Sequence, residues 1–141
     1  MRVVFDTNIY VSALVFPGGS AGEAMLRIID GRDTLLIPRE ILDELLFTLS
    51  RKFSRDAEQL SRVAVNISEI TETVTIKKEK RLNVLKDSPD NRILECAIEG
   101  RADLIITGDK EMLNLKSYKG VRIISLRTYV EGMLNSRVTL R

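Results

Sequence analysis

Acidic side chains at four places in the sequence are of the type that binds divalent metal ions. Asp6, Asp90 and Asp109 each stand next to a predicted strand or helix end, and a fourth acid, Asp43 or Glu44, lies within an amphipathic segment. Carboxylates that converge in one cleft repel one another, raise one another's pKa and bind hard divalent cations. A cleft of this kind that admits a phosphodiester would support metal-assisted phosphoryl transfer.

The amino-acid composition narrows the choice of chemistry. The 141 residues include no histidine and a single cysteine, Cys96, which excludes Ser-His-Asp and Cys-His catalysis and Cys-rich zinc sites. Carboxylate ligands without imidazole or thiolate favour Mg²⁺ or Mn²⁺ over zinc or copper.

The hydrophobic fraction of 44% is typical of one globular domain, for which we expect residues 1–134, followed by a C-terminal tail over 135–141. No apolar run approaches the roughly 20 residues of a membrane span, and no secretory leader is visible, so we expect a cytoplasmic protein.

Buried strands that alternate with amphipathic helices must position these acids. Short apolar runs predict strands over 3–5, 35–37, 104–106 and 121–124, and an alternating pattern predicts an edge strand over 70–76. Helical periodicity follows over 24–29, 38–49, 54–67, 88–99, 110–113 and 126–134. This order predicts an α/β fold, a three-layer α/β/α sandwich with a central, mostly parallel sheet. In such sheets the functional crevice lies beyond the carboxyl ends of the strands, where Asp6 and Asp109 fall.

Each acid also has a purely structural interpretation. Asp6 and Asp109 can cap the helices that follow them, because aspartate accepts hydrogen bonds from exposed first-turn amides. Asp90 points into the apolar face of its helix and therefore needs a partner such as a metal ion, although a first-turn aspartate also gains from the helix dipole. Asp43 and Glu44 lie at opposite margins of one apolar stripe, and either can be an ordinary surface charge.

Four segments, taken together, resemble the PIN-domain family. They are Val4 to Asn8, Pro38 to Leu45, Asp87 to Asn91 and Leu104 to Lys110, in matching order and spacing across nearly the whole chain. The chain is similar in particular to the prokaryotic, VapC-like branch described as toxin components of toxin-antitoxin pairs. The resemblance implies a metal-binding quartet, and it selects Glu44 over Asp43. The implied catalytic and metal-binding residues are Asp6, Glu44, Asp90 and Asp109.

The same resemblance implies an activity and partners. Thr107 and Asn8 match polar positions that can orient the carboxylates or a metal-bound water, and Glu111 stands where many relatives have aspartate. The implied protein is an Mg²⁺- or Mn²⁺-dependent endoribonuclease. Members of this branch are often homodimeric and are inhibited by a small antitoxin protein.

An RNA substrate must be held near this acidic site. Without the quartet, 22 basic residues face 20 − 4 = 16 acidic residues, a balance that favours a polyanion. The candidate contacts with the RNA backbone are Arg51, Lys52, Arg55 and Lys110, together with the basic run at 77–81.

Two other functions compete with the nuclease. In an aspartate-based phosphoryl-transfer domain Asp6 would be a covalent nucleophile, but Asn8 stands where haloacid-dehalogenase-like phosphatases have a second aspartate. A receiver domain would need an acceptor aspartate after a middle strand, where Pro38 stands instead. A catalytically silent PIN scaffold would bind only RNA or a protein partner, yet such scaffolds usually lose one or more acids, and all four persist here.

Overall fold

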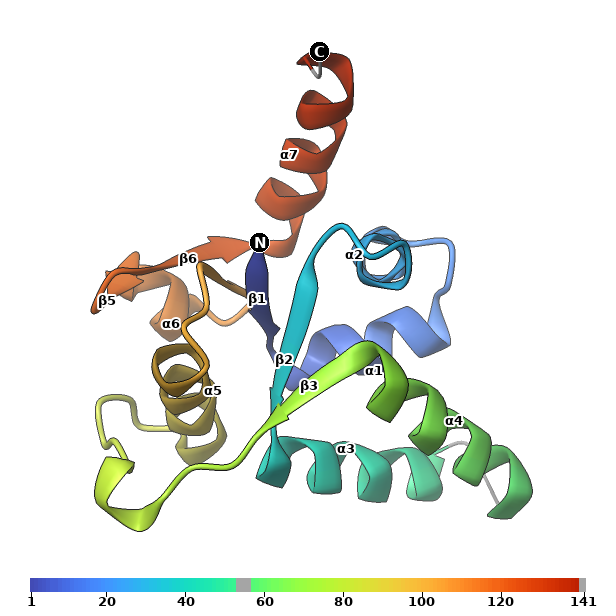
Figure 1. Cartoon of the computed structure of the whole chain (residues 1–141), viewed down its shortest axis with the longest axis horizontal. Helices are drawn as coiled ribbons and strands as arrows, with labels where there is room; N and C mark the ends of the chain where they lie inside the picture. The colour runs from blue at the N-terminus through green and yellow to red at the C-terminus, as the bar shows by residue number, and fades with distance from the viewer. Residues whose placement is uncertain (53–56, 140–141) are drawn as a thin grey trace.

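A six-stranded, mostly parallel sheet forms the centre of the fold (Figure 1). The computed structural model describes residues 1–52 and 57–139. Its strands are β1 (Arg2–Phe5), β2 (Thr34–Pro38), β3 (Thr71–Val74), β4 (Leu104–Thr107), β5 (Ser117–Tyr118) and β6 (Val121–Ser125). They lie in the order β3-β2-β1-β4-β6-β5, and only the pairing of β5 with β6 is antiparallel. The predicted buried strands are confirmed, and β3 occupies an edge as its alternating pattern predicted.

Helices cover both faces of this sheet, which confirms the predicted three-layer α/β architecture. Among the described residues they are α1 (Thr7–Val15), α2 (Ser20–Ile29), α3 (Arg39–Lys52), α4 (Ala57–Ile70), the short 3-10 helix η1 (Lys78–Lys80), α5 (Ser88–Glu99), α6 (Lys110–Leu115) and α7 (Leu126–Thr139). Helix α5 packs against β1, β2 and β4 on one side, whereas α1 and α2 lie on the other side (Figure 1). No helix of the described part is long and apolar enough to cross a bilayer.

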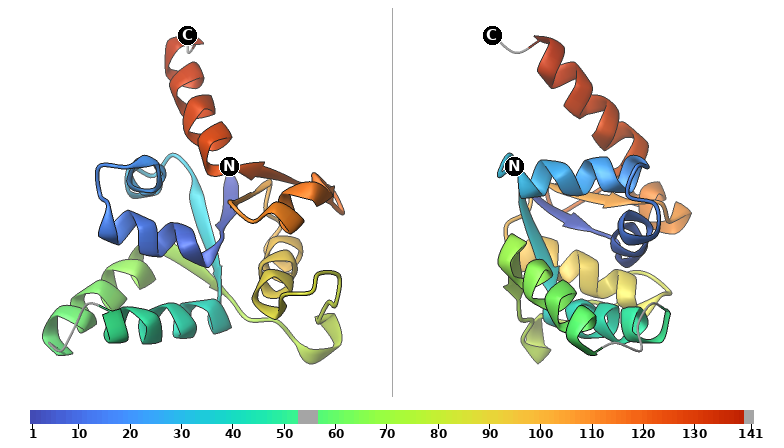
Figure 2. Two further views of the ribbon diagram at one scale, coloured as in Figure 1. Left: turned by 180° about the vertical axis from the view of Figure 1, so that it is seen from behind. Right: turned by 90° about the vertical axis from the view of Figure 1, so that its right-hand side faces the viewer.

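Some element boundaries differ from the sequence prediction. Strand β3 spans Thr71–Val74 rather than 70–76, because α4 continues to Ile70 and the Thr71 hydroxyl donates to the Ile67 carbonyl at 2.7 Å. The last helix continues to Thr139 instead of ending at 134, since no proline or glycine follows Gly132 in that stretch. The part of α7 beyond the sheet projects from the body of the molecule (Figures 1 and 2).

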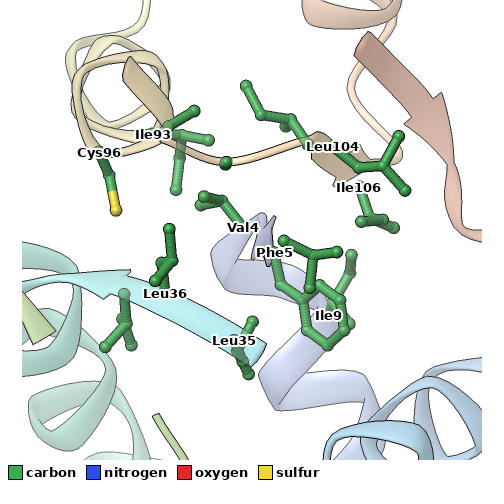
Figure 3. Packing of buried hydrophobic residues seen from close by; sticks show 14 of the residues in the cluster. Val4, Phe5, Ile9, Leu35, Leu36, Ile93, Cys96, Leu104 and Ile106 are labelled. Carbon is green, nitrogen blue, oxygen red and sulfur yellow. The ribbon is translucent and has the colours of Figure 1, made fainter. Parts of the chain in front are cut away.

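Fully buried aliphatic and aromatic side chains fix the register of the central strands (Figure 3). Val4 pairs with Leu36 on one side and with Ile105 on the other, and Phe5 pairs with Ile106. A slip of one residue would turn these buried side chains to the other face, so the register is strongly specified. As a consequence β1 and β4 end side by side, and the residues that follow them meet at one edge of the sheet.

A buried carboxylate just before the amino-terminal end of β2 links the sheet to two helices. Asp33 is 5% exposed and accepts hydrogen bonds from Arg27 Nε of α2 at 2.6 Å, from the Tyr129 hydroxyl of α7 at 2.5 Å and from the Met1 ammonium at 2.9 Å. Burial raises the pKa of Asp33, but the hydrogen bonds from Tyr129, the amino terminus and Arg27 outweigh it and lower the pKa below its usual value. The ionised carboxylate therefore stabilises the fold at neutral pH.

We expect Asp33→Asn to lower the free energy of unfolding by roughly 2–4 kcal/mol at pH 7, because it leaves the Arg27 guanidinium without its buried counter-charge. Urea denaturation measures this loss, with Asp43→Asn on exposed α3 as the matched control. Because the folded pKa is lowered, the loss should shrink as wild-type Asp33 becomes protonated at acidic pH. Equal stability of the two variants at pH 7 would contradict the structural role of Asp33.

Candidate metal centre

Three acids reach one edge of the sheet from three different elements. Asp6 directly follows β1, Asp109 follows β4 after Gly108, and Asp90 lies in the first turn of α5. The parallel register brings the first two together, since the Asp6 backbone N–H donates to the Ile106 carbonyl at 3.0 Å. Helix α5 packs across β1 and β4, and the negative charges of Asp6 and Asp109 both act on Asp90. The fold thus gathers residues separated by about a hundred positions in the sequence.

The Thr107 hydroxyl links the two strand-end acids. Thr107 is fully buried at the end of β4, where its hydroxyl donates to Asp6 Oδ2 at 2.9 Å and accepts the Asp109 backbone N–H at 3.0 Å. Asn8 contributes through its backbone N–H, which donates to Asp6 Oδ1 at 3.3 Å, while its side chain is exposed. These bonds hold the Asp6 carboxylate in a fixed orientation.

Asp6 and Asp109 are also the N-caps of α1 and α6, as their positions predicted. Asp6 Oδ1 accepts the Asn8 amide, and Asp109 Oδ2 accepts the Met112 amide at 2.9 Å. A carboxylate has two oxygens and about four lone-pair sites, so one capping bond leaves room for a cation. The structural and the functional interpretations of these two residues are therefore compatible.

Asp90 is the most unusual carboxylate of the site. It is 7% exposed and accepts no hydrogen bond from any described residue. Burial, followed by the negative charges of Asp87, Asp109, Asp6 and Glu111, raises the pKa of Asp90 to about 7. A buried carboxylate among like charges is costly without a counter-ion, which makes Asp90 a natural cation ligand.

Glu111 joins this cluster from the first turn of α6. Oxygen atoms of Asp90, Asp109 and Glu111 lie within 4.8 Å of one another. All the donor atoms are oxygens, which are the ligands that Mg²⁺ and Mn²⁺ prefer. Asp90 is buried, Asp109 is half-buried and Glu111 is exposed, so an ion there could keep part of its water shell. The sequence interpretation had given Glu111 no ligand role, although its spacing of two residues from Asp109 places it in the same helical turn.

A network behind the site fixes the start of α5. The Asn91 side chain is buried, accepts the backbone N–H groups of Val84 and Leu85 at 3.0 and 2.8 Å, and donates to the Leu85 carbonyl at 2.9 Å. Glu95, one turn further along, accepts the Leu82 N–H at 2.6 Å. The loop over 82–87 is thus bound to α5, and Asp90 is held by a rigid neighbour rather than by its own bonds.

Two of the four predicted acids, Asp6 and Glu44, are not among the described residues whose ligand atoms lie within 4.8 Å of one another. Glu44 and its alternative Asp43 are both exposed on α3, and neither has a hydrogen bond or ion pair in the described part of the chain. Helix α3 starts directly after β2 at the same sheet edge and packs against α1 and α5. The assignment of Glu44 as a metal ligand remains a prediction.

The predicted RNA contacts are spread over two elements. Lys110 is exposed and begins α6 directly after Asp109. Arg51 is exposed near the end of α3, with its guanidinium 5.7 Å from the centre of the Phe47 ring, and Lys52 is the last residue of that helix. Arg55 lies outside the described residues.

We expect Glu111→Gln to weaken Mn²⁺ binding by about 10- to 100-fold, because it removes one charged oxygen donor from the cluster. Glu69→Gln on α4 is the matched control, since it makes the same change at an exposed position, and Glu44→Gln tests the predicted ligand on α3. Isothermal titration calorimetry of the three variants measures the effect. A larger loss in Glu44→Gln than in Glu111→Gln would assign the fourth ligand to α3 instead.

Comparison with known proteins agrees with this architecture. A solved structure of VapBC-1 from nontypeable Haemophilus influenzae is similar in fold, with a TM-score of 0.63 at 16% identity over 90% of this chain and 99% of that one. VapBC2 from Rickettsia felis, solved with a DNA fragment from its promoter, gives a TM-score of 0.59 at 19% identity over 89% and 98%.

Sequence similarity identifies the family. An uncharacterized protein of Methanocaldococcus jannaschii, MJ1680, is 32% identical over 120 residues, which cover 82% of this chain and 76% of that protein. The family model for the PIN domain matches residues 2–111, a segment that includes Asp6, Asp90, Asp109 and Glu111. The fold, the strand-end acids and this match together show that the chain belongs to the PIN domain family.

Proposed function

We propose that this protein is a metal-dependent endoribonuclease that hydrolyses RNA phosphodiester bonds with Mg²⁺ or Mn²⁺. The main support is the buried Asp90 carboxylate, which has no hydrogen-bond partner among the described residues and lies within 4.8 Å of the Asp109 and Glu111 oxygens. Membership of the PIN domain family supports the nuclease class. Carboxylate-only sites of this kind suit phosphoryl transfer better than redox chemistry.

The residues of the site have distinct roles in this proposal. Asp90, Asp109 and Glu111 would hold the cation, with Asp6 and Glu44 completing the acidic set. Such a cation, when bound, lowers the pKa of a coordinated water and offsets charge on the phosphate oxygens. The Thr107 hydroxyl keeps the Asp6 carboxylate aimed at the site through its 2.9 Å bond. With no histidine in the chain, proton transfer relies on carboxylates and water.

A covalent aspartyl mechanism has less support from the geometry. Both Asp6 oxygens already accept hydrogen bonds, Oδ1 from the Asn8 amide and Oδ2 from the Thr107 hydroxyl. These bonds stabilise the charge of the carboxylate and make it a weaker nucleophile. We therefore favour attack by water over attack by Asp6.

Purified protein should cleave single-stranded RNA with Mn²⁺ or Mg²⁺ and should stop when EDTA is added. Denaturing gels of end-labelled RNA measure the cleavage. The chemical groups at the ends of the RNA fragments are a second readout, because in-line attack by water leaves a 5′-phosphate and a 3′-hydroxyl. RNA that binds the protein but stays intact would favour the silent scaffold, and a trapped aspartyl phosphate would favour the phosphoryl-transfer alternative.

We also propose a small antitoxin as protein partner, with a homodimer as the assembled state in the cytoplasm. The two solved structures compared above are VapBC proteins. An apolar groove of about 320 Å³ between α1, α2 and α4 supports a protein partner, since it is flanked by Leu14, Leu26 and Ile29 at 43%, 54% and 58% exposure. Co-expression with the product of a neighbouring small reading frame, followed by size-exclusion chromatography with light scattering, tests the partner. Dimers of the protein alone that are lost in Leu26→Glu would assign the groove to a second copy.

A further inference from the structure

A cavity opens beside the metal centre on the side of α1 and α7. It measures about 380 Å³ and is lined by Asp6, Asn8, Ile9, Ser12, Gly108, Asp109 and Leu126. Its lining residues come from the end of β1 and the first turns of α1, from the loop before α6 and from the start of α7. Two of the acids form one wall, so an RNA whose phosphate lies at the acids must place a neighbouring group in or across this cavity.

The lining of the cavity does not favour a second phosphate as the occupant. Among the described residues the lining has two carboxylates, Asp6 and Asp109, and no lysine or arginine. A phosphate in the cavity would therefore depend on the cation proposed at the acids, which the scissile phosphate already needs. A neutral part of the substrate, which in RNA is the base or the ribose, needs no such counter-charge.

The remaining lining suits the base rather than the ribose. Ile9 and Leu126 offer apolar surface for a flat ring, while the side-chain amide of Asn8 and the Ser12 hydroxyl have no hydrogen-bond partner in the described part of the chain. An asparagine amide carries both a donor and an acceptor and can bond two adjacent groups of a base edge. Proteins that read RNA sequence do so mainly through unpaired bases held in this way.

No aromatic side chain from residues 1–52 or 57–139 lines the cavity, and this affects how strongly the subsite would select among bases. Stacking on aromatic rings binds all bases with little preference, whereas hydrogen bonds to a base edge distinguish them. Binding through Asn8 and Ser12 would therefore discriminate among bases more than it would add affinity.

We propose that this cavity is a nucleobase subsite that holds the unpaired base next to the scissile phosphate and sets the sequence preference of cleavage. The proposal rests on the ribonuclease function proposed above and adds specificity-determining residues to it. Ser12 and Asn8 read the base edge, and Leu126 packs against its face. Leu126, the first residue of α7, lies outside the segment 2–111 that the family model matches.

Cleavage of an RNA pool with a randomised central segment tests this subsite, with the cut positions determined by sequencing. Wild type should show a bias for one base beside the cut. Ser12→Ala and Leu126→Ala should reduce that bias and lower kcat/KM on the preferred sequence about tenfold or more, while Mn²⁺ affinity stays unchanged and Ser12→Ala keeps the wild-type Tm. Leu126 also packs against the hydrophobic core, so Leu126→Ala is assayed well below its Tm. Ser68→Ala, an exposed serine on α4, is the matched control and should keep the wild-type bias.

Binding provides a readout that does not depend on cleavage. Fluorescence anisotropy of short labelled RNAs with the Asp90→Asn variant, in which cleavage should be lost, measures the same base preference. Base-selective binding that disappears when Ser12→Ala is added would support the subsite even if the wild type cuts no RNA. Cleavage with an unchanged cut pattern in Ser12→Ala and Leu126→Ala would overturn the subsite and leave the nuclease intact. If the protein shows no cleavage and no base-selective binding, the subsite and the proposed ribonuclease function are both overturned.

Discussion

Asp90→Asn should reduce the rate of RNA cleavage by at least about 100-fold, because it removes the buried charged oxygen around which the metal site is built. Asparagine keeps the size and shape of the side chain, so the loss should come from charge and metal binding rather than from misfolding. Single-turnover cleavage of labelled RNA at saturating Mn²⁺ measures the rate, and circular dichroism verifies the fold.

Asp87→Asn is the matched control for this experiment. Asp87 lies three residues earlier, is exposed and makes no side-chain capping bond, yet its charge also acts on Asp90. Removing it changes the local charge by the same amount without removing a ligand, so the rate should stay within about threefold of the wild type. If both variants lose activity equally, the loss of one negative charge near the site, rather than the loss of Asp90 as a metal ligand, would explain the result. Full activity in Asp90→Asn would indicate a contaminating nuclease or a different site.

The second large effect should appear in stability without metal. The folded state raises the pKa of Asp90 from about 4 to about 7, so the folded protein binds the proton more tightly than the unfolded chain does. The contribution of protonated Asp90 to the free energy of unfolding is therefore fully present at low pH and is lost as the pH rises from about 4 to about 7. At about 1.4 kcal/mol per pKa unit this rise corresponds to about 4 kcal/mol, which solvent screening reduces to roughly 2–4 kcal/mol. In EDTA, Asp90→Asn should exceed the wild type in free energy of unfolding at pH 8 by about this amount.

Urea titrations of wild type and Asp90→Asn at pH 5 and pH 8 measure the effect, and the difference between the two proteins cancels the other titrating groups. The difference should shrink at pH 5. Addition of Mg²⁺ at pH 8 should raise the Tm of the wild type but not that of Asp90→Asn, because only a protein that binds the ion is stabilised by it. A pH-independent difference would show that Asp90 is not electrostatically strained in the folded state.

Much of the fold could be predicted from local patterns. The strand over Val3 to Phe5 and the strand over Leu104 to Ile106 are short apolar runs bounded by polar residues, and their burial on both faces follows from that pattern. The helical segment that starts near Ser88 was likewise evident from its periodicity and from Pro89 in its first turn. Boundaries were less certain, as the longer α7 shows, because helix ends depend on breakers and packing rather than on periodicity.

The site was only partly predictable. Asp6 and Asp109 follow buried strands, so their place at the carboxyl edge of a parallel sheet could be inferred before the structure. The inward direction of Asp90 also followed from the helical period. Glu111 was identified as a cluster member only in the structure, because the 4.8 Å proximity of its carboxylate to Asp90 depends on how α6 and α5 approach each other.

The sequence by itself determined the order of most strands and helices, the absence of histidine chemistry and the placement of acids at element ends, since these depend on residue type and spacing within one segment. The helix α1 and the short strand β5 were not among the predicted ranges. The tertiary structure alone decided which acids share a site, how strongly Asp90 is buried, and that a cavity lies between α1 and α7. The physical reason is the distance along the sequence over which each effect acts. Hydrophobic periodicity is a local property of the chain, whereas charge repulsion, burial and cavity shape arise between segments up to about a hundred residues apart.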